Sequence, residues 1–310
     1  METQVTPSLR GVFAPIVTPF RPADGAVDHP WIVRHLAYLR AHGLTGPIPC
    51  GTNGEASSMS VAERMEVVET VMAAAGDMPV IAGTGASALP DAISLTRHAF
   101  AAGAAAVLVM PPFYYKKPPE AGVAAWFQRL FDAAVPPGGR ALLYHIQQTT
   151  GVPITDGLLR LLLASHGEVV YGIKDSTGDP AEGRRLRGDF PQLAYFACND
   201  HLVGEARRAG GAGSITAGAN VFPDLVAAVQ AAAWRGGDVA TAQAALSAAR
   251  TLLESYPLQP ATKAALTDVA GLPPTAVRPP QAELTAVQRA ELAAALAANL
   301  PKWRPTTNDR

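Results

Sequence analysis

VVYGIKDSTGD, at residues 169–179, is an apolar run that reaches one lysine, Lys174, and then gives way to small polar residues. Side chains alternate between the two faces of a strand, so Val170, Gly172 and Lys174 are expected on one face. Burial of a lysine lowers its pKa and leaves a nucleophilic free amine, and Gly172 is expected to leave room for an adduct. Residues 176–180 are typical of a turn into a helix, where α/β proteins carry active sites. The alternative is an edge-strand lysine in water.

Strand-like and helix-like segments alternate along the chain on both sides of this stretch. Strands are expected at residues 11–20, 46–50, 79–84, 105–110 and 141–146, at the Lys174 segment, and at residues 193–197 and 213–217. Helices are expected between them at residues 29–42, 61–75, 91–102, 121–134, 156–165, 201–209 and 224–234. Successive βα units with short turns predict an α/β fold, a parallel (β/α)₈ TIM barrel, rather than an open sheet.

The barrel is expected to close near Trp234, so residues 1–235 are predicted to form the barrel that carries the active site. The remaining residues, 236–310, predict a C-terminal helical extension. Its helices are expected at residues 241–255, 261–269 and 285–300. A minimal barrel takes about 250 residues, so a chain of 310 residues suits one such domain with an appended helical layer.

Composition and charge exclude several classes of partner. The chain is 48% hydrophobic and 16% charged, with a formal net charge of −1 and no basic run, so nothing indicates nucleic acid. The longest apolar run, residues 99–113, is interrupted by Gly103 and is shorter than the roughly 20 residues that span a bilayer. Cys50 and Cys198 are too few for a disulfide framework, and residues 1–10 lack the apolar core of a signal peptide. The sequence predicts a cytoplasmic protein with a small-molecule partner and no membrane segment.

Polar residues at the predicted strand ends are the candidates for chemistry. The turn GTNGE, residues 51–55, has glycines that let backbone N–H groups approach a ligand. It is interpreted as a carboxylate cradle or, alternatively, as a glycine turn that caps the next helix. Tyrosines at residues 114, 115 and 144 are either core aromatics with a solvated hydroxyl or proton relays beside the amine. The sequence has no Cys/His cluster with metal-ligand spacing, so no metal is expected.

These segments, in this order, resemble the dihydrodipicolinate synthase/N-acetylneuraminate lyase family of Schiff-base, pyruvate-handling aldolases. GVFAPIVTPF at residues 11–20 resembles the family's opening strand, and GTNGE resembles its GTTGE or GSTGE box. The fifth-strand tyrosine, Tyr144, is matched as well. GIKDSTG at residues 172–178 and GSITAGAN at residues 213–220 resemble the family's lysine strand and its eighth strand. Together the five boxes cover most of the chain and make a strong match, which no single box would.

The resemblance implies a set of catalytic residues. Lys174 corresponds to the imine-forming lysine, and Tyr144 to the phenol that transfers protons above it. Thr52 and Tyr114 would complete a hydroxyl relay. An extra residue in this loop relative to some relatives leaves Tyr115 as the alternative relay member.

The resemblance also implies a set of binding residues and reveals three departures. The backbone of the box at Gly51, with the Asn53 side chain, would hold the keto acid's carboxylate, and Ile215 would line the pyruvate pocket. Asn53 replaces a hydroxyl residue, but its amide can still donate to a carboxylate. Thr149 stands where lysine-pathway synthases have an arginine for the aldehyde's carboxylate, which argues against that substrate. Cys198 replaces a glycine and either packs or narrows the second-substrate pocket.

The reaction implied by the resemblance is that of a class I lyase without a metal or organic cofactor. Expected substrates are 4-hydroxy-2-oxo acids or 2-keto-3-deoxy sugar acids, cleaved to pyruvate and an aldehyde or formed from them. The alternatives are a dehydratase that acts through the same imine, dihydrodipicolinate synthase, and a non-catalytic barrel that only binds a keto acid. A homotetramer is expected by analogy with relatives.

Overall fold

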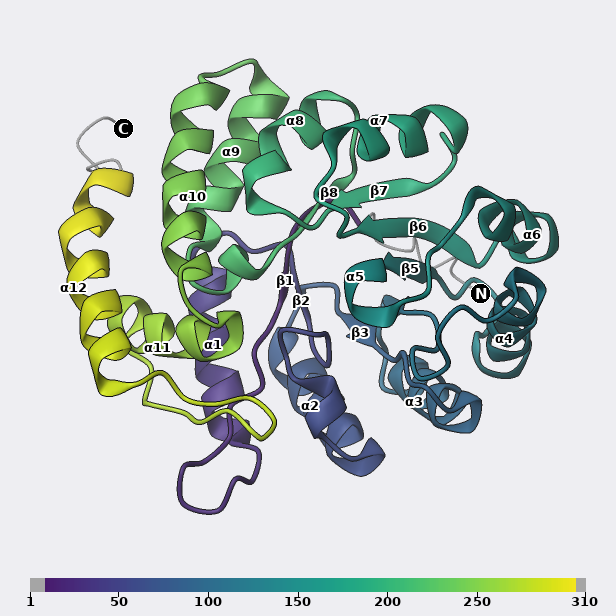
Figure 1. Ribbon diagram of the computed structural model, residues 1–310, viewed down its shortest axis with the longest axis horizontal. Helices are drawn as coiled ribbons and strands as arrows, with labels where there is room; N and C mark the ends of the chain where they lie inside the picture. Colours follow the sequence, from purple (N-terminus) through teal and green to yellow (C-terminus); the bar gives the residue numbers. More distant parts are fainter. Residues whose placement is uncertain (1–8, 305–310) are drawn as a thin grey trace.

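Eight parallel strands form a nearly closed barrel inside a ring of helices in the computed structural model, which describes residues 9–304 (Figure 1). The predicted (β/α)₈ barrel is therefore confirmed. Most strands are shorter than predicted, and the first ends at Pro15 rather than at residue 20. The strands are β1 (Gly11–Pro15), β2 (Gly46–Ile48), β3 (Ile81–Gly83), β4 (Ala106–Val109), β5 (Ala141–His145), β6 (Val170–Asp175), β7 (Ala194–Ala197) and β8 (Gly213–Ile215).

The strands follow the order β2-β1-β8-β7-β6-β5-β4-β3, and every hydrogen-bonded pair is parallel. The gap between β2 and β3 is bridged just beyond the end of β2, where the backbone N–H of Gly83 donates to the oxygen of Pro49 at 2.9 Å. Because all the strands run in one direction, their carboxyl ends meet on one face of the barrel. Residues that follow different strands are thereby brought together.

The lysine strand β6 contains a β-bulge that the sequence pattern does not reveal. Its register with β5 shifts after Ala141, which pairs with Val170, whereas the next residue of β5 pairs with Gly172. Val170 packs in the outer layer of the core, between the strands and the helices. The expectation that Val170 shares a face with Lys174 is therefore wrong, because the extra residue changes the alternation of side chains.

Gly172 has a different role from the expected one. A Cβ atom at this position would lie only 2.3 Å from the backbone oxygen of Ala194 on β7. The glycine is therefore required for the close approach of β6 to β7. Space for an adduct beside Lys174 comes from a cavity rather than from the missing side chain.

The barrel helices for which the sequence predicts a range begin and end close to it, whereas the helices at Gln147–Thr150 and Pro180–Asp189 had no predicted range. The turn predicted after the lysine strand is present, since Asp179 caps the following helix by accepting from the N–H of Ala181 at 2.8 Å. Short 3₁₀ helices follow β2, β7 and β8 at residues 56–58, 200–202 and 217–220. The α-helices are α1 (His29–Ala41), α2 (Val61–Ala75), α3 (Leu89–Ala101), α4 (Glu120–Ala134), α5 (Gln147–Thr150), α6 (Asp156–His166), α7 (Pro180–Asp189), α8 (Val203–Arg208) and α9 (Pro223–Arg235).

The hydrophobic core has two layers, as expected for strands that are covered on both faces. Inside the barrel, large side chains such as Phe13 and Phe196 fill the lumen, with their rings in edge contact at 5.9 Å between centroids. A larger outer layer packs the strands against the helices. The lumen is thus solid below the strand ends, and a ligand can enter only from the face above them.

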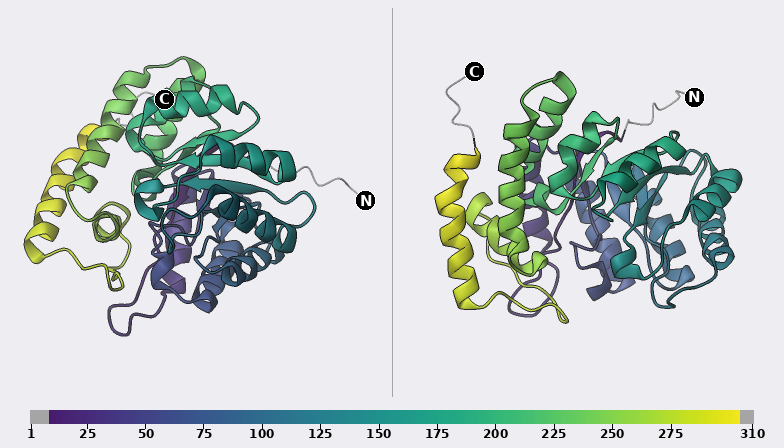
Figure 2. Two further views of the ribbon diagram at one scale, coloured as in Figure 1. Left: turned by 45° about the vertical axis from the view of Figure 1, so that its right-hand side comes forward. Right: turned by 45° about the horizontal axis from the view of Figure 1, so that its top comes forward.

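Three helices follow the barrel, α10 (Val239–Glu254), α11 (Leu258–Ala270) and α12 (Ala286–Trp303), and they lie together on one side of it (Figures 1 and 2). The predicted helical extension is present, while its treatment as a unit that begins at residue 236 stays a prediction. A buried ion pair joins it to the barrel, in which Lys263 of α11 donates to Glu55 at 2.5 Å. No helix within residues 9–304 is long and apolar enough to cross a membrane.

Candidate active site

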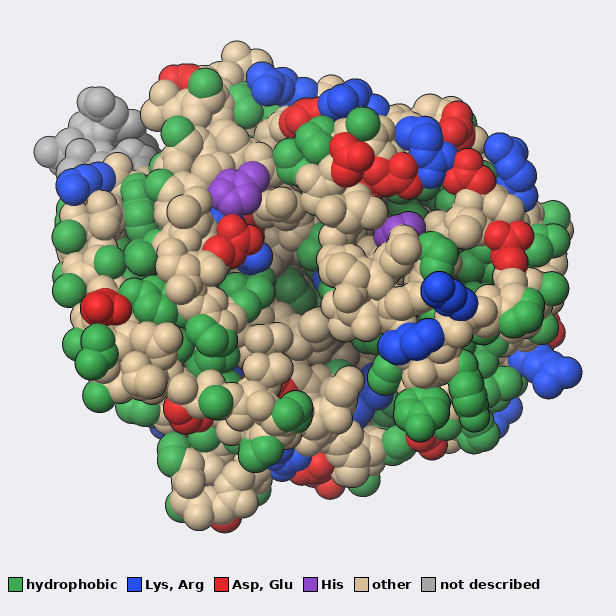
Figure 3. Space-filling model, viewed as in Figure 1, with side chains coloured by type: hydrophobic (Ala, Val, Ile, Leu, Met, Phe, Trp, Pro, Cys, Tyr) green, Lys and Arg blue, Asp and Glu red, His purple; other side chains and the backbone are tan. Residues whose placement is uncertain are grey.

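A cavity of about 320 Å³ opens where the strands end, at the low end of the roughly 300–1,000 Å³ typical of small-molecule sites. The space-filling view shows the molecule hollowed on this face (Figure 3). The barrel and the helical extension both contribute to its walls. The lining residues are Pro15, Thr52, Asn53, Tyr144, Ile146, Gln148, Lys174, Ser176, Thr177, Gly178, Cys198, Asn199, Ala217, Arg250, Glu254, Leu258 and Gln259.

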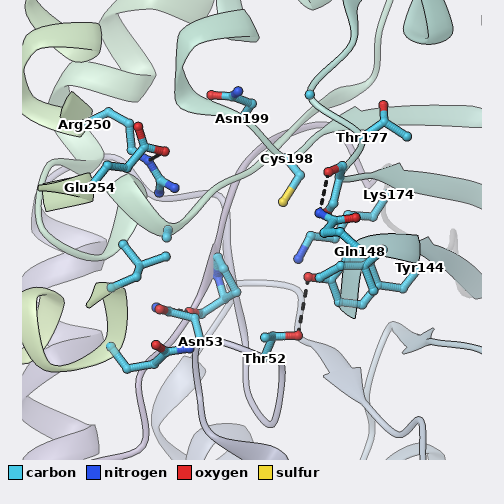
Figure 4. A pocket seen from close by; sticks show the side chains of 17 residues that line it. Thr52, Asn53, Tyr144, Gln148, Lys174, Thr177, Cys198, Asn199, Arg250 and Glu254 are labelled. Atoms are coloured by element: carbon cyan, nitrogen blue, oxygen red, sulfur yellow. Dashed lines mark hydrogen bonds and ion pairs between the residues drawn. The ribbon is translucent and has the colours of Figure 1, made fainter. Parts of the chain in front are cut away.

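Lys174 lies at the base of this cavity and is 2% exposed. Its partner across the ladder is Tyr144 of β5, so the two side chains leave neighbouring strands side by side. The lysine Nζ lies 3.9 Å from the centre of the Tyr144 ring, and the two side chains meet in the close view of the cavity (Figure 4). Among residues 9–304, no carboxylate lies within ion-pair distance of Lys174. The amine is therefore buried, unneutralised and turned toward an open cavity.

The hydroxyl groups above the amine form a short chain. The Thr52 hydroxyl donates to the Tyr144 hydroxyl at 3.5 Å, the outer limit of a hydrogen bond (Figure 4). Thr52 follows β2, so two strand ends place these groups independently of each other. A hydrogen bond of this length in a free site can shorten when a substrate is bound.

The pKa of Lys174 is set by opposing effects. Burial is the largest and lowers the pKa, but the Cys198 thiol and the Tyr144 hydroxyl raise it, and the net pKa lies above its ordinary value. The expected net lowering is therefore wrong, because polar groups that stabilise the ammonium ion line the same cavity. A proton must leave the ammonium form of Lys174 before the amine can attack.

The turn after β2 is shaped to receive an anion. Within the described part of the chain, the backbone N–H groups of Thr52 and Asn53 have no hydrogen-bond acceptor. Cys50 and Glu55, on either side of the turn, have φ angles of 57° and 53°, a conformation uncommon for residues other than glycine. Asn53 is held in place by donating to the oxygen of Pro15 at 3.1 Å. Successive unpaired N–H groups in a strained turn are typical of anion-binding sites.

The structure brings together five of the predicted site residues, namely Thr52, Asn53, Tyr144, Lys174 and Cys198, which all line the cavity. Gly51, in the turn after β2, is buried but does not line the cavity. Ile215 is fully buried in the barrel lumen, and Ala217 lines the cavity in its place.

The remaining predicted residues lie outside the cavity of this chain. Thr149 is exposed on α5, where its neighbour Gln148 faces the cavity instead. Tyr114 and Tyr115 are 74% and 76% exposed and contact each other edge to face at 5.3 Å. The roles predicted for these three residues are not supported by their positions in a single chain and stay predictions.

Two charged residues that the sequence patterns missed also line the cavity. Arg250 and Glu254 lie one turn apart on α10, opposite Lys174 and Tyr144 (Figure 4). They belong to no strand end and to none of the five boxes, because the helix is part of the extension. A signal was present nevertheless, since they are the charged residues of the otherwise uncharged segment VATAQAALSAARTLLE at residues 239–254.

Fold and site together define a TIM barrel with a buried lysine at the carboxyl end of its sixth strand, facing a cavity. The model of the Dihydrodipicolinate synthetase family matches residues 8–299. The chain therefore belongs to this family.

The most informative relatives cover nearly the full chain. An uncharacterized DapA-like lyase of Chloroflexus aurantiacus is 48% identical over 286 residues, which is 92% of this chain and 95% of that protein. The 4-hydroxy-tetrahydrodipicolinate synthase of Pelobacter propionicus is 34% identical over 93% of this chain and 97% of its own. Among solved structures, YagE, a prophage protein of the dihydrodipicolinic acid synthase family from E. coli K12 in complex with pyruvate, has a TM-score of 0.86. It is 28% identical and covers 94% of this chain and 98% of its own.

Proposed function

We propose that this protein is a class I pyruvate aldolase, a lyase that cleaves or forms 4-hydroxy-2-oxo acids, including 2-keto-3-deoxy sugar acids. The observation that carries the proposal is the placement of Lys174, buried without a carboxylate partner at the base of the cavity and against Tyr144. Family membership and the pyruvate bound to YagE support a keto-acid substrate. The N–H groups of Thr52 and Asn53 suit its C1 carboxylate.

The covalent step begins when the Lys174 ammonium group loses a proton to solvent. The free amine attacks the C2 carbonyl, and loss of water from the resulting carbinolamine leaves an iminium ion. The Tyr144 hydroxyl, beside the amine and hydrogen-bonded to Thr52, donates its own proton to the departing oxygen and becomes a phenolate. Because the iminium ion is an electron sink, the reaction needs no metal or organic cofactor.

Cleavage then breaks the C3–C4 bond of the bound keto acid. Tyr144, as the phenolate, accepts the proton of the C4 hydroxyl, the C3–C4 electrons move into the iminium ion, and an aldehyde leaves. The enamine that remains takes a proton at C3 from the Tyr144 hydroxyl, and water hydrolyses the iminium ion to release pyruvate and the Lys174 ammonium group. The Tyr144 phenolate then regains a proton from solvent. Addition of the enamine to an aldehyde is the same sequence in reverse.

The test is reduction with borohydride in the presence of pyruvate, followed by mass analysis of peptides. One reduced pyruvate is expected at Lys174, together with irreversible loss of activity. Incubation with lactate in place of pyruvate is the matched control, because lactate has no carbonyl to form an imine. An adduct at another lysine, or none, would contradict the mechanism.

A second candidate function, dihydrodipicolinate formation, is favoured by the name of the Pelobacter relative. It would use the same enamine on aspartate semialdehyde. Side-by-side kcat/KM values for that aldehyde and for an uncharged hydroxyaldehyde separate the two functions. Product analysis with a 2-keto-3-deoxy acid separates an aldolase from a dehydratase. If an imine forms but no substrate is turned over, the protein is a barrel that only binds a keto acid. A homotetramer remains the expected oligomeric state, which gel filtration with light scattering tests. The cytoplasm remains the expected location.

A further inference from the structure

The cavity has a second wall, whose charges the proposed chemistry does not use. Of the described residues that line the cavity, two are cationic, Lys174 and Arg250. Arg250 comes from α10, and its side chain is 13% exposed. Figure 4 shows Arg250 and Glu254 together across the cavity from the amine. A substrate bound to Lys174 through C2 and anchored at C1 would direct its far end into the space between these walls.

Arg250 is already neutralised by two carboxylates. Its Nη1 lies 3.3 Å from Oδ2 of Asp200, and its Nε donates to Oε1 of Glu254 at 2.7 Å. Asp200 is fully buried and is fixed by accepting from the N–H of Gly218 at 3.1 Å. The two carboxylates hold the guanidinium from different sides. They also leave less of its charge available to a ligand.

The charge state of this wall follows from the same contacts. Burial is the largest effect on Arg250 and lowers its pKa, but Asp200 and Glu254 more than offset it, so that the arginine remains cationic. Burial is the largest single effect on Glu254 and raises its pKa. The contacts with Arg250 and His201 together lower the pKa by more than burial raises it, so the net pKa lies below the ordinary value. Glu254 is therefore a carboxylate at neutral pH. An anionic group on the substrate would meet this carboxylate beside an arginine that is already paired.

Amide side chains also line the cavity, and Gln148 lies on the side of Lys174 and Tyr144 (Figure 4). Gln148, Asn199 and Gln259 line the cavity, and the first two are positioned by hydrogen bonds to the backbone of Ser176 and His201. Amides both donate and accept hydrogen bonds, as hydroxyl groups do. A carboxylate beside amides is well suited to accept hydrogen bonds from a chain of hydroxyls and unsuited to a second anion.

We propose that Glu254, paired with Arg250, is the specificity-determining residue for the aldehyde half of the substrate, selecting an uncharged polyhydroxylated chain and rejecting one that ends in phosphate or carboxylate. This inference rests on the proposed aldolase function and names its substrate class. It also explains how a cavity that contains an arginine can disfavour an acidic aldehyde. The selective element is the repulsive carboxylate rather than a missing cation.

The test compares 2-keto-3-deoxygluconate with 2-keto-3-deoxy-6-phosphogluconate, which differ by one terminal phosphate. The native protein is expected to have the higher kcat/KM with the unphosphorylated acid. Glu254→Gln keeps the shape of the side chain, removes its charge and leaves Arg250 paired with Asp200 alone, so the ratio should move toward the phosphorylated acid by about tenfold to a hundredfold. Glu205→Gln, which removes an exposed carboxylate paired with Arg184 outside the cavity, is the matched control and should leave the ratio unchanged.

Either a native preference for the phosphorylated acid or an unchanged ratio in Glu254→Gln would overturn the inference. Borohydride trapping with pyruvate in each variant separates failure of this inference from failure of the proposed aldolase function. If an imine forms at Lys174 but the ratio is unchanged in Glu254→Gln, only the role of Glu254 in specificity is refuted. Calorimetric binding of both acids to Lys174→Ala gives a readout that does not depend on turnover. The same preference is expected there, and failure of both acids to bind overturns the inference.

Discussion

Lys174 and Lys263 are both 2% exposed, but their surroundings differ. Lys263 donates to Glu55 at 2.5 Å and to the oxygen of Ala276 at 2.7 Å, so its charge is compensated and two of its three ammonium hydrogens are engaged. Lys174 has an aromatic ring beside it, no carboxylate within ion-pair distance among residues 9–304, and a cavity in front of it. One lysine joins two parts of the molecule, whereas the other is available to a ligand.

The pKa values of the two lysines would select the wrong one as the nucleophile. Burial is the largest effect at both positions and lowers the pKa. At Lys263 the net pKa is lowered despite Glu55, and at Lys174 it is raised by Cys198 and Tyr144. Yet a lysine locked in an ion pair cannot reach a substrate carbonyl. Access and the lack of a partner therefore identify the reactive amine better than its resting pKa does.

The strongest way to break this comparison is to remove Lys174. Lys174→Ala is expected to lower kcat/KM by on the order of 10⁴-fold or more, because Lys174 is the only lysine among residues 9–304 that lines the cavity. Its circular dichroism and denaturant midpoint should stay close to those of the native protein, since no ion pair is lost. Substantial residual turnover would mean that another lysine is the nucleophile.

Removal of the neighbouring hydroxyl tests the relay. Tyr144→Phe keeps the ring beside the amine but should lower kcat by roughly 10²–10⁴-fold, the usual contribution of a proton relay. The dissociation constant of pyruvate should change much less, because the hydroxyl acts mainly in the transition state. Thr52→Val should act in the same direction and more weakly. An unchanged kcat would return Tyr144 to the role of a core aromatic.

Removal of Lys263 should affect stability instead of chemistry. Lys263→Met leaves Glu55 buried without its cation and should lower the free energy of unfolding by about 3–5 kcal/mol, measured by denaturant titration. Glu55→Gln in the same chain should recover part of this loss. Lys302→Met, which removes an exposed lysine on α12, is the control. Turnover per folded molecule should fall far less than in Lys174→Ala, and a comparable fall would show that the two lysines do not divide the roles as argued.

The sequence was sufficient to predict the barrel and the base of its cavity, because both depend on local patterns. Alternation of apolar and amphipathic segments predicts βα units, and parallel strands bring their carboxyl ends together. Thr52, Tyr144 and Lys174 were found for that reason. Val170 was misplaced because a bulge depends on pairing between strands, which a single strand's pattern does not contain.

The far wall of the cavity could not be predicted in the same way. Arg250 and Glu254 belong to a helix that packs over the strand ends, and its position depends on tertiary contacts with α8 and α9. The net pKa of Lys174 also could not be predicted from the pattern of a single strand. It depends on Cys198, which approaches the lysine from the end of β7, a strand formed by residues more than fifteen positions later in the chain.

The smallest expected effect sharpens the comparison of the two amines through pH. The raised pKa of Lys174 means that the free amine becomes more abundant as the pH rises, so the rate of borohydride trapping with saturating pyruvate should increase toward alkaline pH. Cys198→Ala removes the larger contribution that raises this pKa and leaves Tyr144 alone to oppose the lowering by burial. The trapping profile should therefore move to lower pH, with a rate at neutral pH that is higher by less than about tenfold. Saturating pyruvate separates this effect from altered binding. A profile that stays in place or moves to higher pH would show that Cys198 does not act on the ammonium group, and Tyr144 would then be the group that sets the lysine's pKa.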